Sequence, residues 1–183
     1  MLRSKIYSVF IFVILLIVPV RLLATTFEYE LKAAFIFNFA KFVKWTNPFD
    51  IDQRDTLPLC ILGKDPFGTV IDRLEGKKVQ DYILHIKRIA AVEDNSDCRI
   101  LFISKSETDR LSTLLTTLEQ KKGILTISDI KGFANSGGVI ELVLNKNRVQ
   151  FIVNIAAAKD SELYLSSKIL RLATVIGSEK GGN

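Results

Sequence analysis

Residues 98–128, CRILFISKSETDRLSTLLTTLEQKKGILTIS, decide the fold class of this chain. The continuous apolar runs at the two ends of this stretch, CRILFIS and ILTIS, are typical of strands buried on both faces. Between them, residues 107–120 carry leucines at helical spacing, and Ser104 with Glu107 forms a capping-box pattern before the helix. A buried strand, a helix and a second buried strand predict a right-handed crossover in a parallel sheet.

The part of the chain before this stretch repeats the same order of elements. Residues 57–62 form an apolar run of strand length, and the Gly-rich turn GKDPFGT follows directly. A phosphate-binding loop is one interpretation of that turn, but such a loop places Lys and then Ser or Thr after its last Gly, and this turn does not. Asp65 as N-cap and Pro66 at the first helical position instead predict a helix to about Leu74. A further strand is expected over residues 82–89.

An aromatic-rich segment near the N-terminus, EYELKAAFIFNFAKFVKW at 28–45, is typical of a helix. Thr25 and Glu28 form a capping box at its start, and Asn47-Pro48 is expected to end it. Its polar residues recur every three positions on one narrow face, at Asn38, Lys41 and Lys44. Because the other faces are apolar, we expect a mostly buried helix, with an exposed partner-binding helix as the alternative.

The C-terminal third of the chain has a different pattern. Residues 129–138, DIKGFANSGG, form a Gly-rich loop in which Phe133 is expected to be exposed. The runs at 139–144 and 148–154 then predict a β-hairpin with a short loop over 145–147. The expected remaining elements are a helical turn over 156–161, a last helix or extended segment over 166–176, and a frayed tail over 177–183.

These elements predict a single α/β domain over residues 25–176. Strands alternating with helices imply right-handed crossovers and a mixed, mainly parallel sheet flanked by helices, to which the C-terminal β-hairpin is added. No internal repeat, linker or low-complexity segment divides the chain. A domain of roughly 150 residues is large enough to bury an adequate core.

Residues 1–24 have the organisation of a removable secretory signal. Arg3 and Lys5 precede an apolar run over 6–20, and Ala24 is a small residue at the expected cleavage position. A retained transmembrane helix is the alternative, but this run is shorter than the roughly 20 apolar residues that cross a bilayer. Three of the 25 basic residues and none of the 20 acidic ones lie in this segment, so its removal lowers the formal net charge from +5 to +2. Such a balanced surface does not indicate nucleic-acid binding.

The two cysteines, Cys60 and Cys98, gain significance from export. A secreted chain meets an oxidising environment, in which such a pair can persist as a disulfide. Two buried free thiols are the alternative.

Residues that could carry catalysis are sparse. His85 is the single histidine and lies in a predicted strand, where a solvent-facing or hydrogen-bonded role is expected. Two cysteines, one histidine and no local acidic cluster do not supply the donors of a zinc site. Asp65, Asp129 and Glu141 could converge in space, but nothing local indicates a carboxylate pair. We therefore expect no enzyme activity, no metal and no cofactor.

Five stretches, which together span nearly all of the chain after the signal segment, carry a resemblance to a known family. They are KAAFIFNFAKFVKW (32–45), CILGKDPFG (60–68), CRILFISKSE (98–107), ILTISDIKGFANSGGVIELVLNKNRVQFIVN (124–154) and LYLSSKILRLA (163–173). In this order they resemble the YfiR/HmsC-type periplasmic domain, once catalogued as a domain of unknown function.

The resemblance implies an inhibitory periplasmic protein that holds an inner-membrane diguanylate cyclase in its off state, lowering cyclic di-GMP and biofilm formation. It also implies release or sequestration by an outer-membrane lipoprotein. Cys60 and Cys98 match the family's cysteine positions, which implies a redox-sensitive disulfide, whereas the second cysteine pair that some relatives carry around the hairpin is missing here. Another membrane sensor is the alternative partner, and a homodimer is a further assembly to consider.

Two segments are candidates for binding a partner or ligand. Phe133 stands among glycines in the loop before the hairpin. The SSKILRLA segment mixes basic and apolar side chains, which suits a protein interface, at Lys168, Leu170, Arg171 and Leu172. Each segment also has a structural alternative. The glycines around Phe133 could simply permit a tight turn into the hairpin, and Leu170 and Leu172 could belong to the core. A different function would be a small-molecule-sensing module with a pocket near the C-terminal segment, feeding a membrane sensor such as a histidine kinase.

Overall fold

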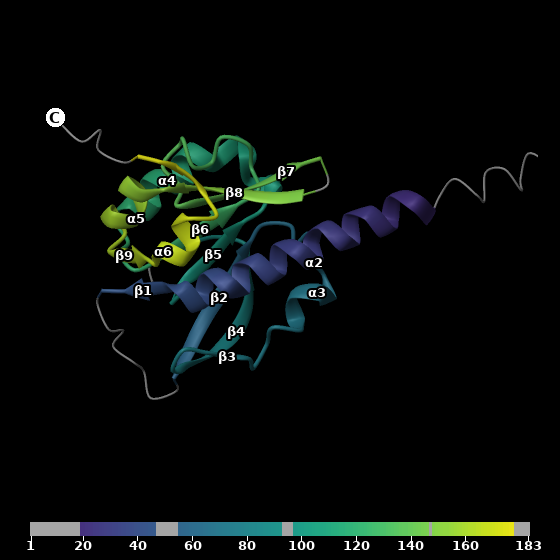
Figure 1. The fold of residues 1–183 in the computed structure, drawn as a ribbon, viewed down its shortest axis with the longest axis horizontal. Helices are drawn as coiled ribbons and strands as arrows, with labels where there is room; N and C mark the ends of the chain where they lie inside the picture. Colours follow the sequence, from purple (N-terminus) through teal and green to yellow (C-terminus); the bar gives the residue numbers. More distant parts are fainter. Residues whose placement is uncertain (1–18, 47–54, 93–96, 147, 178–183) are drawn as a thin grey trace, which may run out of the picture.

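The structure is a computed structural model that describes residues 19–46, 55–92, 97–146 and 148–177, with side chains from Phe27 onward. Within these residues, eight strands form one large sheet and two form a small one (Figure 1). The strands are β1 (Val43–Trp45), β2 (Thr56–Leu62), β3 (Lys78–Val79), β4 (Tyr82–Ile89), β5 (Ile100–Ile103), β6 (Leu125–Ser128), β7 (Ile140–Asn145), β8 (Arg148–Asn154), β9 (Leu163–Leu165) and β10 (Thr174–Ile176). The helices are α2 (Pro19–Phe42), α3 (Thr69–Asp72), the 3-10 helix η1 (Lys105–Arg110), α4 (Leu111–Glu119), α5 (Ile155–Asp160) and α6 (Ser167–Leu170).

The large sheet has the strand order β10-β8-β7-β6-β5-β2-β4-β3. Its strands pair in parallel except at the β7-β8 hairpin and at β3-β4, which are antiparallel. The predicted α/β class, the mainly parallel sheet and the C-terminal hairpin are therefore confirmed. Sequence patterns do not predict β3, because a strand of two residues leaves no measurable periodicity.

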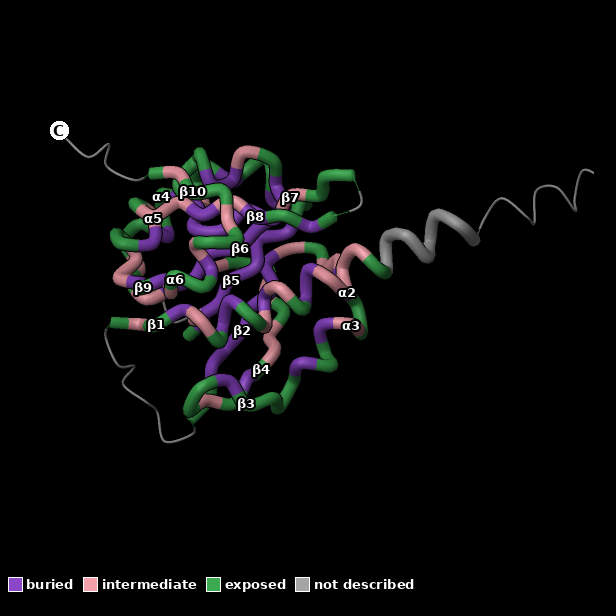
Figure 2. The backbone as a smooth tube through the Cα atoms, in the orientation of Figure 1, coloured by how far each residue is buried: buried purple, intermediate pink, exposed green. Residues whose placement is uncertain are grey.

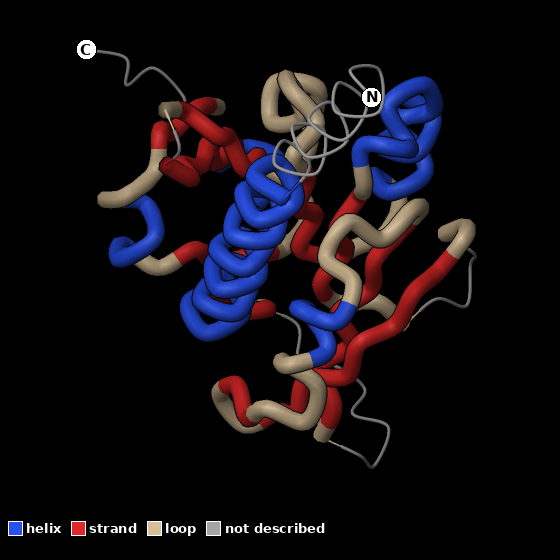
Figure 3. The backbone as a smooth tube through the Cα atoms, turned by 90° about the vertical axis from the view of Figure 1, so that its right-hand side faces the viewer, coloured by secondary structure: helices blue, strands red, loops and turns tan. Residues whose placement is uncertain are grey.

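Hydrophobic clusters lie on both faces of the sheet, which explains the continuous apolar strands. In Figure 2 the central strands β2, β5 and β6 are coloured as buried along most of their length. Along β2, Leu59 and Ile61 face the cluster that α2 covers, while Cys60 and Leu62 face the cluster that α4 covers. Figure 3 shows α2 and the η1–α4 segment on opposite sides of the strands. The polar residues of the aromatic-rich segment, Asn38, Lys41 and Lys44, are exposed, and its apolar faces pack as predicted.

Helix α2 begins at Pro19, so with residues 19–24 present Thr25 lies inside the helix and is not its N-cap. The predicted start at Thr25 is therefore wrong for this uncut chain. Most of the predicted signal segment, residues 1–18, lies outside the described residues. Within the described part of the chain, no helix has both the length and the apolar character needed to span a bilayer.

Helix α2 also ends earlier than predicted, at Phe42. The side chain of Gln80 donates from Nε2 to the carbonyl oxygens of Ala40 and Val43, at 2.9 Å each. These carbonyls belong to the helix terminus, where intrahelical partners run out. The chain then extends into β1, which pairs with β9, and the predicted terminator Asn47-Pro48 lies outside the described residues.

The starts of two other helices differ from the capping patterns. Asp65 accepts from the amide of Phe67 at 2.7 Å, but the helix that follows begins only at Thr69 and is one turn long. Ser104 accepts from the amide of Ser106, while the Glu107 carboxylate contacts Arg110 rather than closing a capping box. Other side-chain partners compete with the motif in both cases, since Asp65 also pairs with Arg88 on β4 and Glu107 contacts Ser106 and Arg110 within η1.

The C-terminal segment over 166–176 contains both of the predicted alternatives. Ser167–Leu170 forms the single turn α6, and Thr174–Ile176 forms β10, which pairs in parallel with β8. The predicted helical turn over 156–161 is α5. The hairpin loop and the tail fall partly outside the description, since Asn147 and residues 178–183 are not among the described residues.

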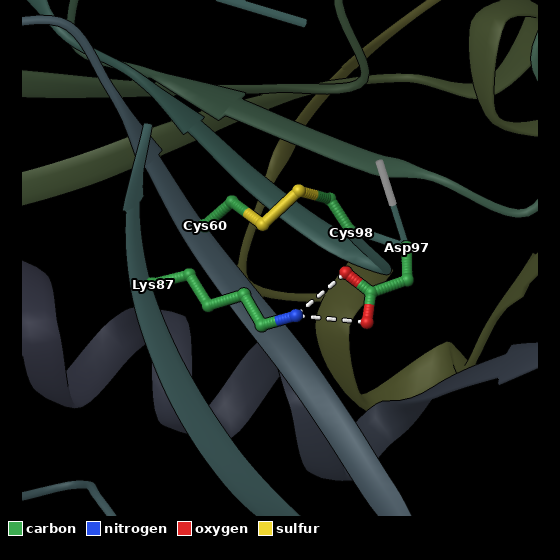
Figure 4. The surroundings of a disulfide bond; sticks show 4 residues. All are labelled: Cys60, Lys87, Asp97 and Cys98. Atoms are coloured by element: carbon green, nitrogen blue, oxygen red, sulfur yellow. Dashed lines mark hydrogen bonds and ion pairs between the residues drawn. A yellow bond between two sulfur atoms is a disulfide. The ribbon is translucent and has the colours of Figure 1, made fainter. Parts of the chain in front are cut away.

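Cys60 and Cys98 form a disulfide, with their Cα atoms 5.7 Å apart (Figure 4). Cys60 lies in β2 and Cys98 lies two residues before β5, so the bond ties two neighbouring central strands together. Both residues are buried in the cluster under α4. Beside them, Lys87 on β4 forms an ion pair with Asp97 at 2.8 Å. The predicted bridge is confirmed.

Candidate partner-binding surface

The predicted segment Lys168–Leu172 lies at the surface around the short helix α6. Ile169 is buried and anchors the turn in the core, whereas Lys168 and Arg171 are exposed. Leu170 is half-buried against the core, as the structural alternative expects. Leu172, just past the helix, is 77% exposed. The segment therefore divides into one core leucine and one leucine that projects into solvent.

A groove of about 320 Å³, which we call the α6 groove, runs between α2, α6 and the inner face of β8. Its floor is aromatic, because the ring of Phe151 on β8 packs at 4.9 Å from Phe39 and at 5.6 Å from Phe35 on α2. The residues that line it are Phe35, Asn38, Phe39, Phe42, Phe151, Lys168, Ile169 and Leu172. The groove combines an apolar floor with an exposed apolar edge, a combination typical of interaction sites.

The charge at the α6 groove is basic. The Lys168 Nζ lies 5.3 Å from the ring centroid of Phe42, at the edge of the groove. Within the described part of the chain, neither Lys168 nor its neighbour Arg171 takes part in an ion pair, and no groove-lining residue is acidic. The two cations are thus available to a ligand or partner.

A second apolar depression, of about 360 Å³, lies on the other side of α6. Leu170 contributes to it, together with residues of α5 and β9 and with Thr46. Tyr164, on β9, is 62% exposed at this depression. Apolar surface therefore continues on both sides of α6.

The second predicted candidate, Phe133, is not exposed, so the prediction of an exposed aromatic in this loop is wrong. Its side chain is fully buried in the cluster that contains Ile130 and Leu62. Its ring packs against the backbone of Gly138 so closely that a Cβ at residue 138 would lie 2.1 Å from Phe133 Cε1. The glycine therefore admits the ring into the core, and Phe133 is not a candidate for contact with a partner.

The loop around Phe133 is held by a buried carboxylate. Glu141, on β7, accepts from the amides of Gly132 at 3.0 Å and Ala134 at 3.1 Å. Asn154 adds a hydrogen bond from Nδ2 to the Ala134 carbonyl at 2.8 Å. Backbone groups in this loop are thereby satisfied without β-pairing, which a buried loop requires.

Lys32, on α2, is a buried lysine that the sequence patterns did not single out. Its Nζ lies 2.5 Å from Asp129 Oδ2 and also contacts the Glu28 carboxylate. The Tyr29 hydroxyl donates to the same Asp129 oxygen at 3.0 Å, and burial, followed by the Asp129 charge, raises the pKa of Tyr29. A signal existed, because Lys32 stands four and seven residues before the core residues Ile36 and Phe39 and so lies on their face of the helix. A lysine on an apolar face requires a buried acceptor.

The groups considered for catalysis have separate partners. His85 is half-exposed, with its Nδ1 2.9 Å from Glu75 Oε1. Asp65 pairs with Arg88, Asp129 with Lys32, and Glu141 with loop amides, so these three carboxylates do not form a pair. Among the described residues, no cluster of three or more His, Cys, Asp or Glu could hold a metal ion.

Comparison with protein families identifies one match, and it covers most of the chain. The family model described as YfiR/HmsC-like matches residues 29–174. The matched range contains the α6 groove, the disulfide and the buried Lys32. A comparison with curated proteins gave no match.

Proposed function

The chain belongs to the YfiR/HmsC-like family, and from this membership we propose that it is a periplasmic inhibitor that binds an inner-membrane diguanylate cyclase and represses it. Members of the family are periplasmic and regulatory rather than catalytic. Repression of the cyclase lowers cyclic di-GMP and biofilm formation. An outer-membrane lipoprotein that sequesters the inhibitor would relieve the repression.

The observation that carries this proposal is the exposed Leu172 at the edge of the α6 groove. Burial of a leucine side chain stabilises a complex by about 1.5–3 kcal/mol, and the aromatic floor offers further apolar area. A binding protein switches a membrane enzyme if it binds one of the enzyme's two states more tightly. A surface of this kind is sufficient for inhibition and needs no catalytic group.

The test is repression in cells that contain a membrane diguanylate cyclase. Deletion of the gene is expected to raise cellular cyclic di-GMP. Reintroduction of the wild-type gene is expected to restore repression and lower the cyclic di-GMP level again. Leu172→Asp should fail to restore repression, because it places a charge in an apolar contact. Ile83→Asp is the matched control, since Ile83 is 38% exposed on β4, near the opposite edge of the sheet. An unchanged cyclic di-GMP level after deletion would contradict the proposal.

A small-molecule-sensing module is the second candidate function, and one observation favours it. A pocket of about 360 Å³ lies between α4 and α5, where Glu119 and Asp160 stand with Lys122 around an apolar base. A ligand that binds only the native state raises the apparent stability of the protein. Thermal shifts across a panel of amino acids and vitamins would identify such a ligand, and an absence of shifts would disfavour this function.

A further inference from the structure

We propose that the α6 groove receives an amphipathic helix whose apolar stripe is flanked by Asp or Glu, presented by the periplasmic part of the membrane partner. This inference rests on the proposed function, because it specifies the chemistry of the partner segment at the same surface. Three properties of the groove carry it, namely its length, the elements that form it and its charge.

The length of the groove matches two turns of a helix. Its α2 wall contains Phe35, Phe39 and Phe42, which recur at i, i+4 and i+7 and lie on one face. Seven residues at 1.5 Å per residue span about 10 Å. A helix that inserts apolar side chains at i, i+3 or i+4, and i+7 presents the same length of apolar surface, which is the general mode of helix-in-groove recognition.

The elements that form the groove favour a helix over an added strand. Its lining residues belong to α2, to α6 with Leu172, and to the side-chain face of β8. Addition of a strand needs a sheet edge with free backbone groups. In this sheet β8 pairs with β7 along most of its length and with β10 over residues 152–154, and Phe151 is the β8 residue that lines the groove. Apart from β8 residues 148–151, which β10 leaves unpaired, the walls of the groove are helical and offer side chains, so side-chain contacts are expected to hold the occupant.

The charge of the groove favours acidic flanks. Lys168 and Arg171 are exposed at the α6 side, whereas Lys41 on α2 lies over the ring of Phe37, which is outside the groove lining. A bound segment would remove part of the hydration of Lys168 and Arg171, which is unfavourable unless carboxylates replace it. Like charges brought together across an interface oppose binding. A helix with basic flanks is thus rejected and one with acidic flanks is accepted.

The same charge argues against a second copy of the chain as the occupant. In a symmetric dimer across this surface, each groove would face the same patch of its partner. Lys168 and Arg171 of the two copies would then approach each other, with no acidic lining residue in either groove to compensate. An anionic bilayer could satisfy the charges, but it is flat, whereas the apolar surface here is concave.

Two synthetic peptides of 18 residues with the same leucine stripe test the inference, one flanked by Glu and the other by Lys. Their binding to the purified protein is measured by fluorescence anisotropy at low and high salt. We expect the Glu peptide to bind at least tenfold more tightly than the Lys peptide, with the difference reduced by salt. The double variant Lys168→Glu/Arg171→Glu should reverse the preference, and Leu172→Asp should weaken both peptides.

The matched control is Lys78→Glu/Lys131→Glu, which changes charge equally at two exposed lysines outside the groove and should leave the preference unchanged. Equal affinity for the two peptides, or binding of neither, would overturn the inference. Wild-type protein that sediments with phosphatidylglycerol vesicles but binds neither peptide would also overturn the inference. A different result separates the two proposals. If the Lys168→Glu/Arg171→Glu variant still represses the cyclase in cells while the Leu172→Asp variant does not, the inference of acidic residues in the partner helix is wrong, whereas the proposed function stands.

Discussion

Lys32 and Asp129 form an ion pair with 2.5 Å between Nζ and Oδ2, and each side chain is only 1% exposed. The pair joins α2 to the loop that follows β6, across 97 residues of sequence. Lys105 approaches the same Asp129 oxygen at 3.4 Å from the exposed side. Because α2 covers one whole cluster of the core, this contact fixes the orientation of the helix over the sheet.

The first prediction concerns this pair. Lys32→Met leaves the Asp129 carboxylate buried without its main partner, and removal of one member of a buried pair costs about 3–5 kcal/mol. The double variant Lys32→Met/Asp129→Leu should recover a large part of that loss, because the buried Asp129 charge is also removed and Glu28, the other partner of Lys32, is partly exposed. Unfolding in urea, monitored by circular dichroism, measures both. Lys41→Met is the control at an exposed position of the same helix, and an equal effect there would contradict the prediction.

The second prediction concerns the end of α2. Gln80→Ala removes hydrogen bonds to the carbonyls of Ala40 and Val43, so we expect a loss of about 1–3 kcal/mol in the free energy of unfolding. Gln80 has a φ of +54°, a region that glycine adopts without penalty. Gln80→Gly should therefore be more stable than Gln80→Ala, although both lose the side chain. The comparison of the two variants by urea unfolding tests both parts, and wild-type stability of Gln80→Ala would refute the role of the amide.

An element of this fold can be predicted from the sequence when the residues that determine it lie within the element itself, and not when they lie far away in the chain. The strands around residues 98–128 were predictable, since burial on both faces leaves a continuous apolar run. The end of α2 was not, because its determinant is Gln80, which no local pattern connects to Ala40. Likewise, the exposure of Phe133 could not be judged from its loop, since its burial depends on the approach of its ring to Gly138.

The candidate surface was half predictable for a similar reason. The mixture of basic and apolar residues at 168–172 indicated an interface, and Leu172 is exposed there. The other wall of the groove comes from Phe35 and Phe42, more than 100 residues earlier, and only the fold brings the two together. A helix expected to be buried thus contributes one wall of the site.

The third prediction is a pH dependence at the edge of the sheet. The hydrogen bond with His85, followed by that from the Ile86 amide, lowers the pKa of Glu75 below its ordinary value of 4.5. A depressed folded-state pKa means that ionised Glu75 stabilises the fold above pH 4.5, and that this contribution is lost as the pH falls through the lower folded value. Since Glu75 is half-exposed, the effect should be that of a surface pair, about 0.2–1 kcal/mol.

Glu75→Gln tests this dependence. We expect the variant to be less stable than wild type at pH 6, with a difference that shrinks as the pH falls below 4.5, as measured by urea unfolding across the range. Glu119→Gln, at an exposed position on α4, should show no such convergence. A difference between Glu75→Gln and wild type that does not change with pH would show that the carboxylate charge has no part in it.

The fourth prediction uses the contact between Gly138 and Phe133. A Cβ at residue 138 would overlap the ring, so Gly138→Ala should destabilise the protein by about 1–3 kcal/mol, the usual cost of overpacking a core. The double variant Gly138→Ala/Phe133→Leu should lose less than the sum of the two single variants, because the smaller side chain leaves room for the methyl group. Strict additivity in thermal unfolding would mean that the two residues do not compete for the same space.

The fifth prediction concerns the Cys60–Cys98 disulfide, which closes a loop of 38 residues containing α3, β3 and β4. In the chain-entropy model, a cross-link of this span stabilises the native state by about 3–4 kcal/mol. Cys60→Ala/Cys98→Ala should therefore lose about that amount in urea unfolding, and wild-type protein in excess dithiothreitol should approach the variant. The variant itself should not respond to dithiothreitol, which makes it the control for effects of the reductant.

Mass spectrometry of non-reduced protein that finds both thiols free would contradict the bridge. Because β2 keeps its parallel pairing with β4 and β5 without the bond, the reduced protein should still fold, so cyclase repression can be compared in the two redox states.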